Sequence, residues 1–446
     1  LRKSPPRLPE VDEPRVVRHY TRLSSWNHGI DSGFYPLGSC TMKYNPRINE
    51  ELARLDGFAK LHPCLPESMC QGALELMWRL EQMLCEVTGM MRFTLQPAAG
   101  AHGELCGVKM IRAYHRSKGK RRHKVLIPDT AHGTNPASCK LAGFDVVEIK
   151  SSSEGILTPE AVSQLLDDDT AAIMVTNPNT LGLFEKNLAE IAEMMHGEGA
   201  LVYCDGANLN SMMGVARPGD MGVDVLQVNL HKTFSTPHGG GGPGAGPVGV
   251  SERLEPFLPV PMVEKRDDTY FLDFDRPQSI GRMKSFYGNF AVMVRAYAYL
   301  REMGAEGLKR ATQLAVLNAN YLRHRLSGPL KLAYDRPCLH EVVFSDESLD
   351  ERGITTLDLA KRLLDYGMHP PTIYFPLVVH GALMMEPTET ESPETLDEFA
   401  TAVEAILAEA ERDPELVRTA PHNTPVGRLD EVRAARRPVL KYPFED

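Results

Sequence analysis

The sequence lacks paired cysteines. Its eight cysteines are scattered singly, with no CxxC pair among them: Cys40, Cys64, Cys70, Cys85, Cys106, Cys139, Cys204 and Cys338. Zinc-ribbon and thioredoxin-like sites therefore have no support. In a chain of 446 residues, isolated cysteines favour mostly free thiols in a reducing compartment. We therefore expect a cytoplasmic protein.

Long apolar runs are also missing. No stretch of about 18 apolar residues is present, so a transmembrane helix is not expected. Residues 1–18 are rich in proline and charge and lack the apolar centre of a signal peptide. The formal net charge of −10 argues against non-specific binding to nucleic acid. The chain begins with Leu1 rather than Met, so we expect the natural N-terminus to lie upstream.

The middle of the chain alternates between short apolar runs and helical patterns. Helical patterns begin at Thr158-Pro159-Glu160 and cover residues 188–196. Five runs between such patterns are continuously apolar, at least in part, as expected of strands buried on both faces: 125–127, 145–149, 172–176, 201–204 and 225–228. The alternation predicts an α/β fold with a mostly parallel sheet and helices on both faces.

The length and the flanking segments predict a division into three parts. A chain of this size suggests two or three domains. We expect an extended N-terminal arm over 1–60, a large cofactor-binding domain over 61–325, and a smaller C-terminal α+β domain with a tail over 326–446. The supporting patterns are helical at 67–87, 290–326 and 396–410 and strand-like at 341–344 and 373–375.

An aspartate and a lysine follow two neighbouring strand candidates. Asp205 comes directly after the run 201–204, and Lys232 follows the run 225–228. Parallel sheets bind ligands at the carboxyl ends of their strands, so both side chains are expected at one site. Pyridoxal phosphate (PLP) requires this pair: a lysine amine condenses with its aldehyde, and a carboxylate holds a proton on its pyridine nitrogen. The alternative is a helix-capping aspartate and a surface lysine.

Three further segments are placed to complete a cofactor site. Residues 96–104 form a small-residue turn before a helical pattern, where free backbone N–H groups can bind phosphate; a plain helix start is the alternative. His132 follows the run 125–127, so its imidazole is placed to stack on a pyridine ring, although a lone histidine is often structural. Asn179 follows the run 172–176 and is placed to hydrogen-bond the ring or the substrate.

A glycine run covers residues 238–246. It is not a Walker loop, because no GK[ST] closes it, and Pro243 interrupts any dinucleotide-binding fingerprint. We interpret it as a flexible loop that lets Lys232 and the substrate approach the backbone closely, with phosphate cradling as the alternative. Residues 35–43 have a turn-like character only, and physical reasoning assigns them no chemistry.

Several long motifs resemble the glycine decarboxylase P-protein family. They are FYPLGSCTMKYNPRIN (34–49), QPAAGAHGE (96–104), DTAHGTNPAS (129–138), TNPNTLGLFE (176–185), YCDGANLNSMMGVARPGDMGVDVLQVNLHKTFSTPHGGGGPGAGPVGV (203–250) and MEPTETESPETLDEF (385–399). The chain resembles the second, lysine-bearing half of that protein, which occurs in some members as a separate subunit. Tyr44 departs from the family pattern, which has a more aliphatic residue there.

The resemblance implies a fold-type I PLP enzyme that decarboxylates glycine and transfers the aminomethyl group to the lipoyl arm of H-protein. It also implies a partner, subunit 1, which helps to build the active site in a two-plus-two heterotetramer. Carried over to this sequence, the catalytic residues are Lys232 as the Schiff-base lysine, Asp205 at the pyridine nitrogen and His132 as the stacking residue. The other matched positions bind the phosphate or flank the ring and the lysine: Gly100, Ala101, His102, Asn208 and His231.

Three other interpretations remain open. Another fold-type I enzyme, such as a cysteine desulfurase or an aminotransferase, shares the strand-end aspartate and the lysine. A desulfurase needs a mobile cysteine, for which Cys338 is the candidate. A non-catalytic scaffold subunit would have no reason to keep Lys232. A nucleotide-binding protein is disfavoured by the missing GK[ST].

Overall fold

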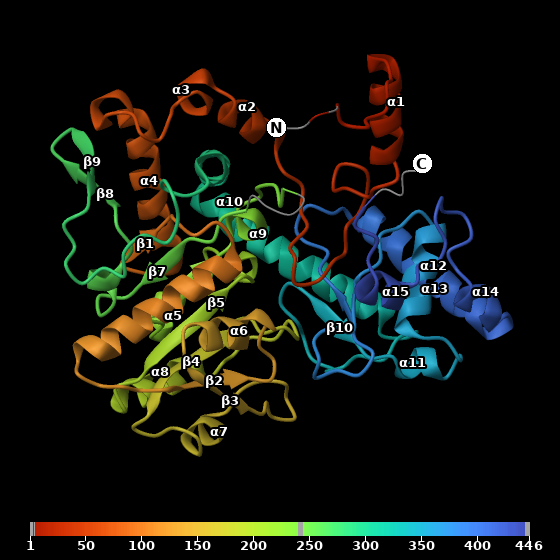
Figure 1. Ribbon diagram of the computed structural model, residues 1–446. Helices are drawn as coiled ribbons and strands as arrows, with labels where there is room; N and C mark the ends of the chain where they lie inside the picture. The colour runs from red at the N-terminus through yellow and green to blue at the C-terminus, as the bar shows by residue number, and fades with distance from the viewer. Residues whose placement is uncertain (1–2, 4, 240–243, 442–446) are drawn as a thin grey trace.

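The computed structural model describes residues 3, 5–239 and 244–441. Its centre is a seven-stranded sheet with the order β1-β7-β6-β5-β4-β2-β3 (Figure 1). The five strands β2 to β6 run parallel, whereas β7 is antiparallel to both β6 and β1. The bounds are β1 Arg92–Thr94, β2 Lys124–Pro128, β3 Asp145–Ile149, β4 Thr170–Thr176, β5 Leu201–Gly206, β6 Val225–Val228 and β7 Val248–Val250. This confirms the mostly parallel sheet that the sequence predicted.

The inner strands are buried because helices cover both faces of the sheet. Every residue of β4, β5 and β6 is buried. Side chains alternate between two apolar clusters: Tyr203 packs with Ile111 on one face, and Val202 packs with Met195 on the other. The helices of this part are α4 Gln71–Thr88, α5 Gly100–Ser117, α6 Thr134–Leu141, α7 Pro159–Ser163, α8 Leu188–Gly197 and α9 Leu230–Thr233.

A two-stranded hairpin lies outside the main sheet. β8 (Met262–Arg266) pairs antiparallel with β9 (Thr269–Asp273). The sequence did not predict this hairpin, because charged residues end the short apolar runs of both strands. Its turn includes Asp267, which has a positive φ of 51°.

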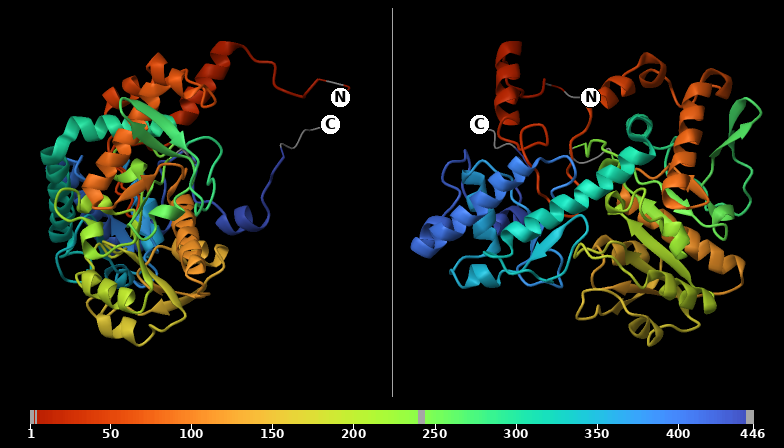
Figure 2. Two further views of the ribbon diagram at one scale, coloured as in Figure 1. Left: turned by 90° about the vertical axis from the view of Figure 1, so that its left-hand side faces the viewer. Right: turned by 180° about the vertical axis from the view of Figure 1, so that it is seen from behind.

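The C-terminal part contains a second, smaller sheet. Its three antiparallel strands have the order β10-β12-β11. The long helix α10 joins it to the main sheet and ends at Leu326, which packs into the C-terminal apolar cluster (Figure 2). The division of the chain at residues 60 and 325 stays a prediction. The remaining bounds are α10 Phe290–Leu326, β10 Val342–Phe344, α11 Glu347–Asp350, α12 Thr356–Asp365, β11 Thr372–Ile373, β12 Leu383–Met385, α13 Pro393–Arg412, α14 Pro414–Arg418 and α15 Glu431–Arg436.

The N-terminal segment has two different halves. Helix α1 (Glu13–Ser24) has no buried residue and stands away from the rest of the chain (Figures 1 and 2). Residues 36–43 instead run inward, before α2 (Arg47–Ala53) and α3 (Asp56–Ala59). The Lys43 ammonium lies 2.6 Å from Glu389 Oε1 and donates to the Thr233 carbonyl at 2.9 Å. The segment is therefore bound both to the C-terminal part and to α9.

No helix among the described residues is long and apolar enough to cross a membrane.

Candidate active site

Asp205 and Lys232 lie at the carboxyl ends of two neighbouring strands. Asp205 lies in β5, in register with Thr176 of β4 and Gln227 of β6. Helix α9 begins directly after β6 and contains Lys232. Because β5 and β6 are parallel and hydrogen-bonded to each other, both residues lie at one edge of the sheet.

The Asp205 carboxylate is held in one orientation. The residue is 2% exposed. One carboxylate oxygen accepts a hydrogen bond from Asn135 Nδ2 at 3.1 Å, and the other accepts from the Ala207 backbone N–H at 3.0 Å. A buried carboxylate needs such donors, since burying an unpaired charge is costly. The two bonds leave the carboxylate with lone pairs for one further donor.

His132 lies within electrostatic reach of both residues. Burial lowers its pKa, the Asp205 carboxylate opposes that shift, and the Lys232 ammonium adds to it. The imidazole is therefore neutral at pH 7. Its Nδ1 atom lies 2.9 Å from Thr134 Oγ1, and the Thr134 hydroxyl in turn donates to Glu104 at 2.6 Å. This chain of contacts fixes the orientation of the ring.

Two polar residues of this environment were absent from the predicted set. Asn135, from α6, orients Asp205 directly. Glu104, from α5, accepts the Ser138 hydroxyl at 2.9 Å, and burial followed by repulsion from Asp205 raises its pKa. Both belong to the quoted motifs, but motif position alone gives no sign that they face Asp205.

The Lys232 amine contacts a segment that is distant in sequence. Its Nζ atom donates to the Ser39 carbonyl at 2.7 Å. The Ser39 backbone N–H donates to Glu341, and Thr41 donates to Glu386 through both its N–H and its hydroxyl. Residues 35–43, to which sequence reasoning assigned no chemistry, therefore border the predicted catalytic lysine.

The start of α5 offers backbone N–H groups without a capping side chain. Its N-cap residue, Ala99, is extended and makes no side-chain cap. The N–H groups of Gly100, Ala101 and His102 belong to the first turn, which has no intrahelical acceptors. The His102 ring accepts the Ala98 N–H at 3.2 Å and so supports the turn. An 18-residue helix whose first turn has no capping side chain among the described residues is suited to bind an anion.

Asn208 and His231 have different surroundings. The Asn208 amide nitrogen donates to the Pro178 carbonyl at 2.9 Å, while its buried Oδ1 atom has no hydrogen-bond partner among the described residues. The His231 ring accepts the Ala245 N–H at 3.3 Å. Burial lowers the pKa of His231 to about 3, so this ring is neutral. Asn208 thus keeps one buried acceptor available for a ligand.

The Asn179 side chain is fully used by hydrogen bonds to its own loop and to the segment between β3 and α7. Its amide nitrogen donates to Gly155 and Glu185, both at 2.8 Å. Its amide oxygen accepts the N–H groups of Leu181 and Leu183. A ring or substrate contact from this side chain stays a prediction, and it would require one of these bonds to break.

The glycine run lies only partly within the described residues. Residues 240–243 of the run 238–246 are outside them. At the far end of the run, Gly246 packs directly against the residue that precedes α5: an added Cβ would overlap the Ala99 carbonyl oxygen. The backbone of the run therefore approaches the start of α5 as closely as only glycine permits.

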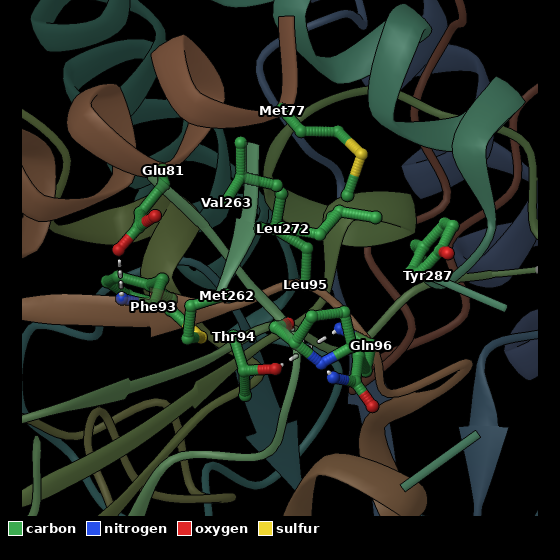
Figure 3. Close-up of a pocket in the computed structure, with 11 residues that line it drawn as sticks. Met77, Glu81, Phe93, Thr94, Leu95, Gln96, Met262, Val263, Leu272 and Tyr287 are labelled. Carbon is green, nitrogen blue, oxygen red and sulfur yellow. Dashed lines mark hydrogen bonds between the residues drawn. The ribbon is translucent and has the colours of Figure 1, made fainter. Parts of the chain in front are cut away.

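A small pocket beside β1 is separate from these residues. Figure 3 shows its mostly apolar lining, which includes Met77, Leu95 and Val263. Glu81 also lines the pocket, and its carboxylate accepts the Phe93 backbone N–H at 3.2 Å. Of the residues that line this pocket, Gln96 alone belongs to a predicted site segment, as the first residue of 96–104.

Comparison with known proteins decides the family. The sequence model described as "Glycine cleavage system P-protein" matches residues 3–346, and that of "Glycine dehydrogenase, C-terminal domain" matches residues 311–423. The chain belongs to the glycine cleavage system P-protein family. The resemblance seen in the sequence motifs is thereby confirmed, together with the predicted role in the glycine cleavage system and the dependence on PLP.

Curated P-protein relatives cover almost the whole chain. A protein of Caldanaerobacter subterraneus, named "Probable glycine dehydrogenase (decarboxylating) subunit 2", is 62% identical over 99% of this chain and 91% of its own length. A protein of Listeria innocua with the same name is 57% identical over 100% of this chain and 91% of its own length. Their shared name indicates a two-subunit enzyme of which this type of chain is one subunit.

Solved structures confirm the fold class of this P-protein chain. An inhibitor-bound glycine decarboxylase (P-protein) superposes with a TM-score of 0.77 at 21% identity, covering 91% of this chain and 92% of the other. A glutamate decarboxylase of Lactobacillus brevis superposes with a TM-score of 0.71 at 16% identity, covering 92% and 96%. At such identities the likeness shows the fold alone, which is the predicted fold-type I architecture.

Proposed function

We propose that this chain is the lysine-bearing subunit of a PLP-dependent glycine decarboxylase. In this proposal it removes CO2 from glycine and transfers the aminomethyl group to the lipoyl arm of H-protein, in the cytoplasm. One observation supports it above all. Asp205 and Lys232 lie at the carboxyl ends of adjacent parallel strands, and His132 interacts electrostatically with both.

The residues present fit the cofactor in charge and in hydrogen bonding. The free first turn of α5, at Gly100, Ala101 and His102, would hold the phosphate. The unpartnered Asn208 Oδ1 atom and the Asp205 carboxylate are buried acceptors for the polar atoms of the ring. When bound, PLP supplies an electron-accepting ring for the carbanion that forms as CO2 leaves.

The side chains of this chain then have distinct tasks. Asp205, fixed by its two donors, keeps a proton on the pyridine nitrogen at the end of the ring. His132 packs as a neutral ring, so it contributes apolar contact without adding positive charge. Lys232 holds the cofactor, and its amine takes up and returns protons when the substrate amine replaces it.

The cysteine desulfurase alternative finds little support in the structure. Cys338 is 4% exposed, and its backbone N–H donates to Asn320 Oδ1 at 3.2 Å. Burial raises the pKa of its thiol to about 12. A persulfide-forming cysteine needs an accessible thiolate. We therefore expect no persulfide at Cys338 when the enzyme is treated with cysteine.

The proposed reaction is tested by isotope exchange. The reconstituted complex of this chain, subunit 1 and lipoylated H-protein should exchange the glycine carboxyl group with labelled CO2. Omitting subunit 1 or H-protein should lower the rate by about 10²-fold or more, since an incomplete site loses orientation of the reacting groups. Exchange with other amino acids in place of glycine would contradict the proposal.

Helix α1 is the proposed contact with subunit 1 in a two-plus-two heterotetramer. It has no buried residue, and its Val16, Val17 and Tyr20 are 37%, 56% and 65% exposed. Apolar side chains at this spacing form one face of a helix. Covering that face with a partner subunit would remove it from water.

Charged substitutions on the apolar face of α1 are expected to weaken subunit association. Val17→Asp combined with Tyr20→Asp should raise the dissociation constant about 30- to 1,000-fold, because each of the two lost apolar contacts costs about 1–2 kcal/mol. Arg18→Gln with Arg22→Gln changes the net charge by the same amount on the opposite face and is the matched control. Sedimentation velocity measures subunit dissociation in both double variants. Equal dissociation constants of the two would exclude this contact.

A further inference from the structure

Two buried acids hold the segment that receives the Lys232 amine. Glu341 Oε2 accepts the Ser39 backbone N–H at 2.8 Å. Glu386 Oε2 accepts the Thr41 backbone N–H at 2.8 Å, and its Oε1 accepts the Thr41 hydroxyl at 2.6 Å. Both acids are 0% exposed. Three hydrogen bonds therefore fix residues 39–41, which we call the lysine-facing loop.

The lysine-facing loop has a backbone conformation that needs such support. Ser39 and Thr41 have φ values of 65° and 51°. This left-handed region is unfavourable for residues with a Cβ, and it persists only where surrounding groups determine it. The Ser39 carbonyl that accepts Lys232 Nζ at 2.7 Å belongs to one of these two residues. The direction of the Ser39 carbonyl is thus set by Glu341 and Glu386, which hold the loop.

The two acids also interact electrostatically with the lysine. Burial raises the pKa of Glu341 well above its usual range, repulsion from Glu386 adds to the shift, and the Lys232 ammonium opposes it. Burial likewise raises the pKa of Glu386, and hydrogen bonds from Thr41 and the Lys232 ammonium oppose it. The acids and the amine therefore form one connected group around the loop.

We propose that Glu341 and Glu386 are positioning residues for Lys232. They fix the lysine-facing loop so that the Ser39 carbonyl receives the Lys232 amine whenever that amine is not joined to the cofactor. The inference rests on the proposed function, since it takes Lys232 as the lysine that holds the cofactor. A released amine that docks at one fixed acceptor stays oriented for its return, which lowers the entropic part of the barrier.

The first test measures the cofactor-free complex. Glu341→Ala and Glu386→Ala should speed hydrogen–deuterium exchange of the peptide containing residues 39–41 about tenfold or more, the factor expected when a hydrogen bond to a carboxylate is lost. Trace acetylation of Lys232 should quicken in the same variants. Glu341→Gln and Glu386→Gln retain an oxygen acceptor and should restore both rates to near the wild-type values.

A matched control separates positioning from general destabilisation. Glu81 is also a buried acid that accepts a backbone N–H, but it supports β1 (Figure 3). Glu81→Ala should lower the melting temperature without changing exchange at residues 39–41 or acetylation of Lys232. Should the alanine variants of the loop acids not fold, Thr41→Val removes only the hydroxyl bond to Glu386 and should still speed exchange of the loop.

The second test uses the loaded complex with glycine. The alanine variants should lower kcat about tenfold while KM stays within about twofold. The reason is that the return of the Lys232 amine is slowed, whereas glycine binding is unchanged. The proposal is overturned if exchange at residues 39–41 and acetylation of Lys232 match the wild type in folded alanine variants. A failure of the proposed function would give a different result, because borohydride would then attach the cofactor to a residue other than Lys232.

Discussion

The Lys232→Ala variant should lose covalent attachment of PLP, and its glycine–CO2 exchange should fall by roughly 10³-fold or more, as expected when the group that forms the covalent link is removed. Lys232 belongs to α9, which follows β6, and it lies at the same edge of the sheet as Asp205. Borohydride reduction followed by peptide mapping should find the cofactor on the peptide with Lys232 in the wild type and on none in the variant.

The control for this experiment is an exposed lysine of the same domain. Lys140 lies near the end of α6 with its side chain in solvent. Lys140→Ala should keep both the borohydride-fixed cofactor and the exchange rate. Cofactor fixed elsewhere on the Lys232→Ala variant, with exchange retained, would show that another amine forms the covalent link to the cofactor.

Asp205→Asn should lower kcat/KM about 10²- to 10³-fold while leaving the cofactor attached to Lys232. The substitution keeps the size of the side chain and removes the charge that holds a proton on the pyridine nitrogen. Asp205 is 2% exposed and bonded to Asn135 and Ala207, so the charge acts in a medium where little solvent screens it. Steady-state exchange and the absorption spectrum of the bound cofactor measure the two effects.

Asp224 provides the matched control for Asp205. It is also a 2% exposed aspartate, but it lies before β6 and accepts the Val202 N–H at 3.0 Å. Asp224→Asn should reduce thermal stability and leave the cofactor spectrum unchanged. Equal exchange rates in Asp205→Asn and the wild type would contradict the role of Asp205.

The sequence predicted those parts of the fold whose pattern is local. The strands at 145–149 and 225–228 have the predicted bounds, because each is a short run between helical patterns. β1 and β7 were missed, since each has three residues and pairs antiparallel with a distant segment. Pairing between distant segments leaves no signal in the local sequence pattern.

The residues of the candidate site were likewise predicted only where the sequence signal is local. Asp205 and Lys232 were predicted because Asp205 directly follows one apolar run and Lys232 lies shortly after the next one. Glu341 and Glu386 were not, since they lie 302 and 345 residues from the loop residues that they bind. Asn179 shows the opposite case: its strand-end position suggested a ring contact, but four hydrogen bonds to other protein groups use the whole amide. Which way a turn residue points is decided by tertiary contacts.

The inward path of residues 36–43 has a consequence for biosynthesis. These residues leave the ribosome early, yet Glu341, Glu386 and Glu389, which bind them, are translated hundreds of residues later. Contacts between such distant segments close late in folding. A nascent chain that stops before Glu386 can complete the seven-stranded sheet while the surroundings of Lys232 remain unfinished. Competence to use the cofactor should therefore be acquired only after the segment that contains Glu386 and Glu389 has emerged.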